Sequence, residues 1–322
     1  MRRIFWIAIG VLAMAAPVRA EPIDVWLDVD PAIGMIEKDV DDGLAMIQAF
    51  HSPELRVHGI SVVFGNSPLE RGIDIAEEVT TRFGAPGLSV HPGAASAEDF
   101  GNDSPAVAAM VSGLEQRPMT ILALGPLTNV GTLLKNHPEI HERISQIIMV
   151  AARRPGQVFR PLPESENVFP DFNFENDPVA MQAILDSEVP LVYAPWEVSS
   201  HLWITNEDLD ALGATGAPGE YIAKKSGSWI RMWKRMFGTE GFNPFDSLAV
   251  AWLTHPELIE HVEVGTWIDP REGSTGVDGQ PAVPHLLADS DRAGGRRAIY
   301  CYRPRPELKR ILLDRLAGPT AK

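Results

Sequence analysis

Apolar and polar positions alternate along the chain between runs typical of buried strands and runs with helical spacing. Apolar runs predict strands over residues 23–30, 55–64, 119–124, 144–151 and 190–194. Apolar residues at helical spacing predict helices over residues 41–50, 68–82, 128–135 and 177–185. Strands that alternate with helices imply a mostly parallel sheet that is buried on both faces. We therefore expect a single α/β domain with a mostly parallel central sheet flanked by helices.

The pattern is less regular after the fourth strand. Residues 153–172 are rich in proline and polar residues and predict a long loop, a kind of segment that often carries function. Residues 217–237 predict an amphipathic helix whose aromatic rings, Trp229 and Trp233 among them, recur at four-residue spacing. Packing into the core is the main interpretation of these rings, and a lid over a ligand is the alternative. Glycines and prolines over 265–295 predict a hairpin or a surface excursion, and a closing helix is expected over 307–316.

The first twenty residues differ in composition from the rest. Two arginines precede a short apolar run, and Val18 and Ala20 suit the −3 and −1 positions of a signal peptidase site. The run is too short to span a bilayer. We expect a signal peptide over 1–20, cleavage after Ala20, and one catalytic domain over 21–322 in the periplasm or outside the cell, without stable membrane insertion. An uncleaved anchor is the alternative.

Charge and cysteine content narrow the classes of function. The formal net charge of −15 argues against nucleic acid as a partner, because phosphate binding needs basic patches. The single cysteine, Cys301, excludes an intrachain disulfide, so an exported chain must rely on its core or on a bound ion. Carboxylates crowded between a strand and a helix then need a specific explanation.

Polar residues gather where the predicted strands end. Six aspartates lie between Asp24 and Met46, and two of them, Asp28 and Asp30, end the first strand. Asn66 follows the second strand, and the sequence GPLTN follows the strand over 119–124. Sites in open parallel sheets form at the carboxyl ends of the strands. These residues are therefore expected to converge on one edge of the sheet.

The chemistry of the aspartate cluster points to a cation. Packed carboxylates repel one another unless some are protonated or a cation neutralises them. Many oxygen ligands favour a hard ion, calcium or magnesium, over zinc, and calcium suits a site that also accepts carbonyls and hydroxyls. Helix capping explains one or two of Asp39, Asp41 and Asp42. It does not explain Asp28 and Asp30, so the pattern favours a metal site.

The Asp28-Val29-Asp30 pair permits a second, minor interpretation. It is similar to the phosphatases of the haloacid dehalogenase type, in which a nucleophile and an acid lie two residues apart on a strand end. The small hydroxyl residue of that family, two positions after the second aspartate, is Ala32 here.

Five motifs over residues 23–260 together resemble the inosine-uridine nucleoside hydrolases in order and spacing. The motifs are LDVDP with DVDDGLAM, GISVVFGNSPLE, ILALGPLTNV, DFNFENDPVA and NPFDSLAVA. The resemblance implies a Rossmann-like core and an enzyme that cleaves the N-glycosidic bond of ribonucleosides to ribose and free base. It also implies a calcium ion, held by aspartates, that binds the ribose 2′ and 3′ hydroxyls and the attacking water.

The resemblance assigns the metal site residue by residue. Asp30 would be a calcium ligand and the general base for the water, Asp42 a second ligand, and Asp246 the last carboxylate. Thr128 would supply its backbone carbonyl. The implied mechanism is physically reasonable, because nearby anions stabilise an oxocarbenium-like state and a carboxylate base activates water.

The resemblance also assigns the substrate contacts. Asp41 would bind a ribose hydroxyl, and Asn66, Asp171 and Asn173 would hold the ribose, with Asp171 at a position that is usually glutamate. Phe245 stands where many members have a histidine that contacts or protonates the leaving base. An aromatic ring there resembles the purine-preferring members, in which stacking assists departure of the base, because phenylalanine cannot donate a proton. Purine or mixed nucleosides are therefore the expected substrates.

Besides Phe245, two further features depart from the family pattern. Ten residues separate Asp30 from Asp41, where the short form of the family has three, and the excess over 34–40 leaves open whether Asp39 joins the site. Arg153 and Arg154 follow the strand over 144–151, near a place where the family usually has a glycine pair. Either these arginines form ion pairs with some of the excess acidic residues at the surface, or they favour a phosphorylated or otherwise anionic substrate.

Two classes of function follow from these residues. The leading hypothesis is an exported, calcium-dependent hydrolase of small-molecule nucleosides, favoured by the intact aspartates. The alternative is an exported protein of the same fold that binds a ribosyl ligand with little turnover, a reading favoured by Phe245 and the altered segment at Arg153. A homo-oligomer is expected from the resemblance alone, since relatives are often dimers or tetramers.

Overall fold

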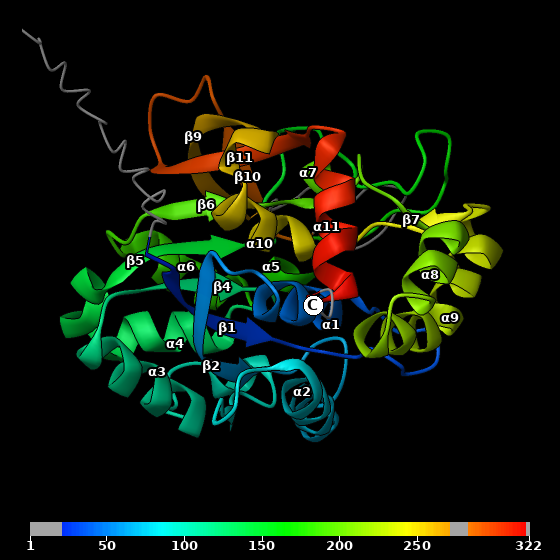
Figure 1. The fold of residues 1–322 in the computed structure, drawn as a ribbon. Helices are drawn as coiled ribbons and strands as arrows, with labels where there is room; N and C mark the ends of the chain where they lie inside the picture. The colour runs from blue at the N-terminus through cyan, green and yellow to red at the C-terminus, as the bar shows by residue number, and fades with distance from the viewer. Residues whose placement is uncertain (1–20, 271–282, 320–322) are drawn as a thin grey trace, which may run out of the picture.

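The computed structural model describes residues 21–270 and 283–319 and is built around a nine-stranded sheet (Figure 1). The strand order is β10 (His285–Asp289), β9 (Ile259–Asp269), β11 (Arg296–Pro304), β6 (Leu191–Tyr193), β5 (Ile144–Met149), β4 (Met119–Ala123), β1 (Ile23–Val29), β2 (Leu55–Val62) and β3 (Val90–Pro92). Neighbours from β3 to β11 pair in parallel, whereas β9 is antiparallel to β10 and β11. The expected mostly parallel α/β sheet is confirmed.

Helices bury both faces of this sheet. Side chains of β1 alternate between two apolar clusters: Val25, Leu27 and Val29 belong to one, and Trp26 belongs to the other. The first cluster is completed by α1 (Asp41–Phe50), α2 (Leu69–Phe83), α9 (Ala217–Phe237), α10 (Ser247–Thr254) and α11 (Glu307–Ala317). The second is completed by α3 (Pro105–Gln116), α4 (Thr128–Asn136) and α6 (Pro178–Asp186).

The shorter elements lie between these layers and at the rim. They are the helices α5 (Phe172–Asn176), α7 (Trp196–Ser199) and α8 (Asn206–Gly213), the two-stranded sheet of β7 (Ile204–Thr205) and β8 (Gly241–Phe242), and the 3-10 helices Ala97–Asp99, Pro138–Arg143 and Pro256–Leu258. Helices α8 and α9 stand together at one side of the molecule (Figure 1).

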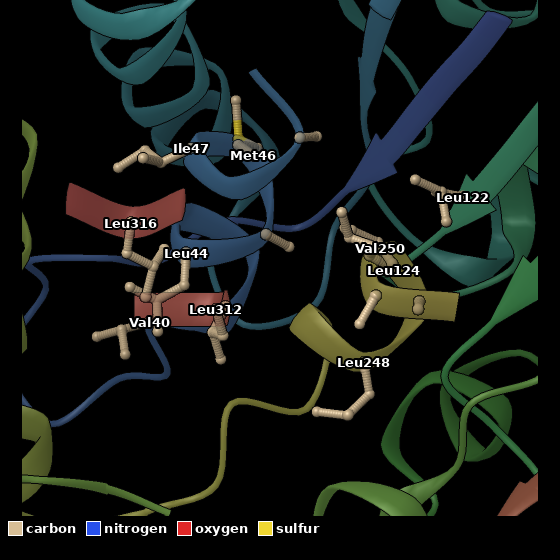
Figure 2. Close-up of a cluster of buried hydrophobic side chains, with 14 of the residues drawn as sticks. Val40, Leu44, Met46, Ile47, Leu122, Leu124, Leu248, Val250, Leu312 and Leu316 are labelled. Carbon is tan, nitrogen blue, oxygen red and sulfur yellow. The ribbon is translucent and has the colours of Figure 1, made fainter. Parts of the chain in front are cut away.

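Helix α1 is the element that carries the paired aspartates, and its apolar face fixes it in the core. Figure 2 shows Leu44, Met46 and Ile47 of α1 in one cluster with side chains of β4, α10 and α11. The helix begins and ends where the sequence predicts, at Asp41 and Phe50. Burial of this helix therefore holds the carboxylates of its first turn at a defined place.

The less regular regions correspond partly to the predictions. Residues between β5 and α5 form a long connection with two isolated bridges, Phe159 to Phe169 within it and Arg153 to Leu287 of β10, as the prediction of a loop implies. The hairpin expected over 265–295 is present as the antiparallel pairing of β9 with β10, although residues 271–282 lie outside the described part. The signal peptide predicted over 1–20 also lies outside the described residues.

Candidate active site

Asp30 follows the carboxyl end of β1 and is fully buried. The backbone N–H of Asn66 donates to its Oδ2 at 2.6 Å, and its own N–H donates to Asp42 Oδ1 at 3.0 Å. Glycines make room for this carboxyl group, because a Cβ at Gly65 would collide with Oδ2 and one at Gly125 would lie 3.1 Å from Oδ1. The strand ends of β2 and β4 thus enclose the Asp30 side chain.

Three further carboxylates meet beside Asp30. Asp41, Asp42 and Asp246 each present an oxygen, and these oxygens lie within 4.8 Å of one another. Asp41 and Asp42 form the start of α1, and Asp246 immediately precedes α10. The two helices contact each other, so residues about 200 positions apart in the sequence are brought into one cluster.

The protonation of this cluster is governed by burial and by mutual repulsion. Burial raises the pKa of Asp42 to about 8 and that of Asp41 to about 6. Burial, and then the charges of neighbouring aspartates, also raise the pKa of Asp30 and of Asp246 well above the usual range. Four carboxyl groups in this arrangement cannot all be ionised unless a cation neutralises them.

The donor set fits a divalent metal. Asp30 Oδ1 is buried without a hydrogen-bond partner, and the three clustered carboxylates present only oxygen atoms. A buried carboxylate oxygen without a hydrogen-bond partner destabilises the folded protein, and a metal–oxygen bond would offset this loss. All-oxygen coordination is characteristic of hard cations. Asp41, Asp42 and Asp246 could hold such an ion directly, with Asp30 adjacent.

A cavity of about 220 Å³ opens onto this cluster. Asn66, Asp171 and Asn173 line it, as do Asp41 and Asp246. The Nδ2 group of Asn173 donates to the carbonyl oxygens of Leu124, at 2.6 Å, and Val150, at 3.2 Å, which leaves Oδ1 free to accept. The residues predicted to hold a ribose therefore surround one cavity, although their roles stay predictions.

Asp171 is held at the edge of this cavity by the chain after β5. Its Oδ2 accepts from the N–H of Ala152 at 2.9 Å, and Ala152 has a positive φ of 79°. Burial raises the pKa of Asp171 to about 7, although the Arg153 charge and this N–H lower it in part. The strained backbone at Ala152, in the left-handed region, thus presents a donor to a carboxyl group that titrates near neutrality.

Replacing Asp171 with asparagine should make stability less dependent on pH. The unfolded aspartate releases its proton near pH 4 and the folded one near pH 7, so the wild type loses stability as the pH rises between these values. The free energy of unfolding of Asp171→Asn, taken relative to that of the wild type, should rise by on the order of 2–4 kcal/mol between pH 4.5 and pH 8. Urea unfolding of both proteins at the two pH values measures this gain, and a difference that does not change with pH would contradict it.

Much of the cavity lining is aromatic. The rings come from the loop after β5, from α5, α7 and α9, and from the residues just before α10, namely Phe159, Phe169, Phe172, Trp196, Trp229, Trp233 and Phe245. Trp229 and Trp233 pack into the core, as the main interpretation of the α9 aromatics predicts, and they also line the cavity. Phe245 lines the cavity next to Asp246, and its contact with a base stays a prediction.

Thr128 is not brought to the cavity. It is the first residue of α4, and its Oγ1 donates to Asp177 Oδ2 at 2.6 Å. Thr128 is not among the residues that line the cavity, and neither are Asp30 and Asp42. The role of its carbonyl as a metal ligand therefore stays a prediction. Leu124, at the end of β4 and in the same motif, lines the cavity instead.

The two departures from the family pattern have defined positions. Asp39 lines the cavity, and its Oδ1 accepts from the N–H groups of Val40, at 2.7 Å, and Asp41, at 3.3 Å. Arg153 pairs with Glu175 at 2.8 Å and Arg154 with Glu197 at 2.9 Å, and neither lines the cavity. The arginines thus pair with acids, and Arg153 does so while buried rather than at the surface.

Several lining residues were missed by the sequence analysis. Leu124 directly precedes the GPLTN motif, so its place at the end of a predicted strand could have indicated it. Asp39, whose membership of the site the sequence left open, lines the cavity. Phe159 and Phe169 lie in an irregular segment, and Trp196 begins the short helix α7, so no local period identifies them. Their place on the wall depends on how the chain after β5 folds back.

The sequence of this chain is similar to that of known proteins. The chain matches the family model described as inosine-uridine preferring nucleoside hydrolase over residues 25–293. The pyrimidine-specific ribonucleoside hydrolase RihA of Citrobacter koseri is 28% identical over 79% of this chain and 91% of the relative. RihA of Escherichia coli O1:K1 / APEC is 27% identical over 84% of this chain and 95% of its own.

Solved structures share the fold. A plant nucleoside hydrolase superposes with a TM-score of 0.77 at 20% identity, covering 93% of this chain and 100% of the other. A purine-preferring ribonucleoside hydrolase from Gardnerella vaginalis superposes with a TM-score of 0.75 at 20% identity, covering 91% of this chain and 98% of the other. At such low identity, this likeness concerns the fold alone.

Proposed function

The chain belongs to the inosine-uridine preferring nucleoside hydrolase family, and on that premise we propose that it hydrolyses ribonucleosides to ribose and free base with a calcium ion held by its aspartate cluster. The observation that carries the proposal is that one cavity is lined both by aromatic rings and by Asp41 and Asp246 of the carboxylate cluster. Membership of this family excludes the alternative that the chain is a phosphatase of the haloacid dehalogenase type. A ligand-binding protein without turnover is an outcome of the test below.

Asp30 is the proposed general base. The N–H of Asn66 holds its Oδ2, whereas Oδ1 has no partner and can take the proton of the attacking water. When bound, calcium would neutralise the clustered carboxylates and supply coordination positions for the ribose diol and the water. Asp41, Asp42 and Asp246 are the proposed carboxylate ligands, with Asp30 as a further one. Their remaining negative charge would stabilise the oxocarbenium-like transition state.

The ribose would be held by the polar residues around the cluster. Asp41 and Asp171 can accept from ribose hydroxyls, and the free Oδ1 of Asn173 is fixed by the two bonds that its Nδ2 makes. Asn66 lines the same end of the cavity. Several fixed acceptors around a cis-diol orient the anomeric carbon, and such positioning lowers the barrier to attack.

We propose purine nucleosides as the preferred substrates. The wall that would receive the base consists of phenylalanine and tryptophan rings, and among the described residues that line the cavity there is no histidine. A large aromatic surface favours a bicyclic base through stacking. Curated relatives of this chain are named pyrimidine-specific, so the base preference is the point at which this chain is expected to differ from them.

A panel of ribonucleosides tests the proposed function. Purified protein with calcium is incubated with inosine, adenosine, guanosine, uridine and cytidine, and free ribose is assayed. Ribose release from the purine nucleosides, with a higher kcat/KM than for uridine and cytidine, is the expected result. Equal or greater release from the pyrimidine nucleosides would overturn the base preference. Calcium binding without ribose from any of the five would favour the ligand-binding alternative.

We further propose that the protein is exported after cleavage behind Ala20. The basic start, short apolar run and small residues of the first twenty positions support this. Within residues 21–270 and 283–319, no helix has both the length and the apolar character needed to cross a bilayer. N-terminal sequencing of the mature protein should begin at Glu21, and a retained Met1 would contradict export by this route.

A further inference from the structure

A second cavity, of about 240 Å³, lies between α3 and the strands β1, β2 and β3. It shares no lining residue with the cavity at the carboxylate cluster, which measures about 220 Å³ and would hold a nucleoside in the proposed function. The second cavity therefore has room for a ligand of about the same size, and it is larger than a single inorganic anion needs.

Small side chains of α3 keep this cavity open. The helix turns one face to it, formed by Ala109, Ser112, Gly113 and Gln116. At Gly113 the helix packs close to the sheet, because a Cβ there would lie 3.0 Å from Met119 Cε and 3.4 Å from Trp26 Cζ3. Larger side chains at Ala109 and Ser112 would fill the space that a ligand needs.

Two stacked rings form a rigid part of the lining. Trp26 is buried, and its Nε1–H donates to Ser61 Oγ at 3.0 Å. The ring of His91 stacks on this indole, with 5.6 Å between the ring centroids and an interplanar angle of 24°. Burial lowers the pKa of His91, so its imidazole is neutral at pH 7 and has one N–H to donate. Because the fold already holds both rings, a ligand that contacts them need not order them.

The charge of the second cavity is opposite to that of the first. Arg117 and two histidines line it, and none of its described lining residues is acidic. The first cavity has four aspartates and no lysine, arginine or histidine among its described lining residues. The chain carries 43 acidic and 28 basic residues, so an acid-free cavity with a guanidinium group runs against its average charge. This cavity therefore favours an anionic ligand.

Arg117 is the group that would bind the anion. Its Nη1 lies 3.2 Å from Nδ1 and 3.3 Å from Nε2 of His58, and it forms no ion pair with an acid within the described part of the chain. The acid beside His58, Asp24, is already bound by His58 at 2.7 Å and by Arg56 at 3.3 Å. The Arg117 charge therefore has no carboxylate of its own, and its Nε and Nη2 groups keep their donors for a ligand.

We propose that the second cavity binds a small organic phosphate, a phosphate monoester of about nucleoside size, with its phosphate at Arg117 and its organic part beside Trp26. A guanidinium group binds phosphate oxygens through two parallel hydrogen bonds. The three terminal oxygens of a phosphate monoester also suit the further donors in the lining, which are His91, Ser112 and Gln116. The site is independent of the proposed hydrolase function, because no residue of the first cavity belongs to it.

Histidine resonances test this site in solution. No histidine lines the first cavity within the described residues, so shifts of His58 and His91 report on the second cavity alone. Calcium-loaded Asp30→Asn protein, in which turnover is suppressed, is titrated at constant pH with adenosine 5′-monophosphate, adenosine and inorganic phosphate, and both histidines are followed by NMR. We expect saturating shifts with the monophosphate, none with adenosine, and at least tenfold weaker binding of inorganic phosphate. Absence of shifts with the monophosphate, or equal affinity for inorganic phosphate, would overturn the proposal.

Two variants locate the bound phosphate. Arg117→Gln removes the guanidinium group and should weaken binding of adenosine 5′-monophosphate about tenfold or more. Ser112→Leu, at an exposed position of α3, should block the cavity without a change of charge. Arg310→Gln removes an exposed arginine of α11 and should bind the monophosphate as the parent protein does. Parent affinity in either of the first two variants would place the monophosphate elsewhere and overturn the site.

Discussion

Replacing Asp30 with asparagine should reduce kcat by about 10²–10⁴-fold or more while the fold is retained, since a general base and a charge next to the metal are lost together. The side chain is buried, and its Oδ2 accepts one backbone hydrogen bond that an amide oxygen can also accept. The isosteric change therefore removes the proton acceptor without creating a cavity. Ribose release from inosine under saturating substrate and calcium measures the effect.

A surface variant separates this effect from general damage. Asp74→Asn removes an exposed carboxylate that pairs with Arg71 on α2, far in the sequence from the cluster, and should leave kcat unchanged. Circular dichroism and thermal unfolding of both variants check the fold. A kcat for Asp30→Asn near that of the wild type, with calcium bound, would remove Asp30 from the role of base.

Replacing Asp246 with asparagine should change stability in opposite directions with and without calcium. Without the ion, Asp246 is repelled by Asp41 and Asp42 in a buried site, so loss of its charge should raise the Tm of the metal-free protein. With the ion, a ligand charge is missing, and the calcium affinity should fall by about 100-fold or more. A loss of that size would reduce the stabilisation by calcium by about 2.7 kcal/mol.

Calorimetric titration with calcium and thermal scans in calcium or chelator measure both effects of Asp246→Asn. Asp186→Asn, on the exposed part of α6, serves as the matched control and should behave as the wild type. Equal calcium affinity in the wild type and in Asp246→Asn would exclude Asp246 from the metal site. If metal-free Asp246→Asn has a lower Tm than the metal-free wild type, Asp246 is not repelled by the neighbouring carboxylates as inferred.

Prediction from the sequence succeeded where one local signal decides the structure. The strand at residue 23 and the helix Asp41–Phe50 follow from uninterrupted apolar patterns, and their packing brings Asp41 and Asp42 beside Asp30. The convergence of the strand ends likewise follows from parallel topology, which brings the backbone of Asn66 to the side chain of Asp30. These features needed no knowledge of long-range contacts.

Prediction from the sequence was incomplete where a long-range contact decides. Thr128 shares its motif with Leu124, but helix α4 begins at Thr128 and draws it toward Asp177. Strand β11 holds the apolar run AIYCY, and α3 places Val107, Met110 and Leu114 at helical spacing, so both could have been predicted from the sequence although they were not. Strand β9 carries several charged residues and gives a weaker signal.

The place of the additional residues between Asp30 and Asp41 also could not be predicted from the sequence. Asp39 turns toward the cavity, while Glu37, with a positive φ of 57°, forms a two-point ion pair with Arg235 of α9 at 2.6 and 2.9 Å. Ser228 of the same helix donates to the Met35 carbonyl at 3.3 Å. The segment that leads to the carboxylates thus contacts the helix that carries Trp229 and Trp233.

The proposed metal site requires that ribose release from inosine depends on calcium. The wild type is stripped with a chelator, assayed, and assayed again after calcium is restored in excess. The stripped protein should release no ribose above the uncatalysed rate, and calcium should restore full activity, because the carboxylate cluster positions substrate and water only around the ion. Full ribose release by the stripped protein would contradict the proposed metal site.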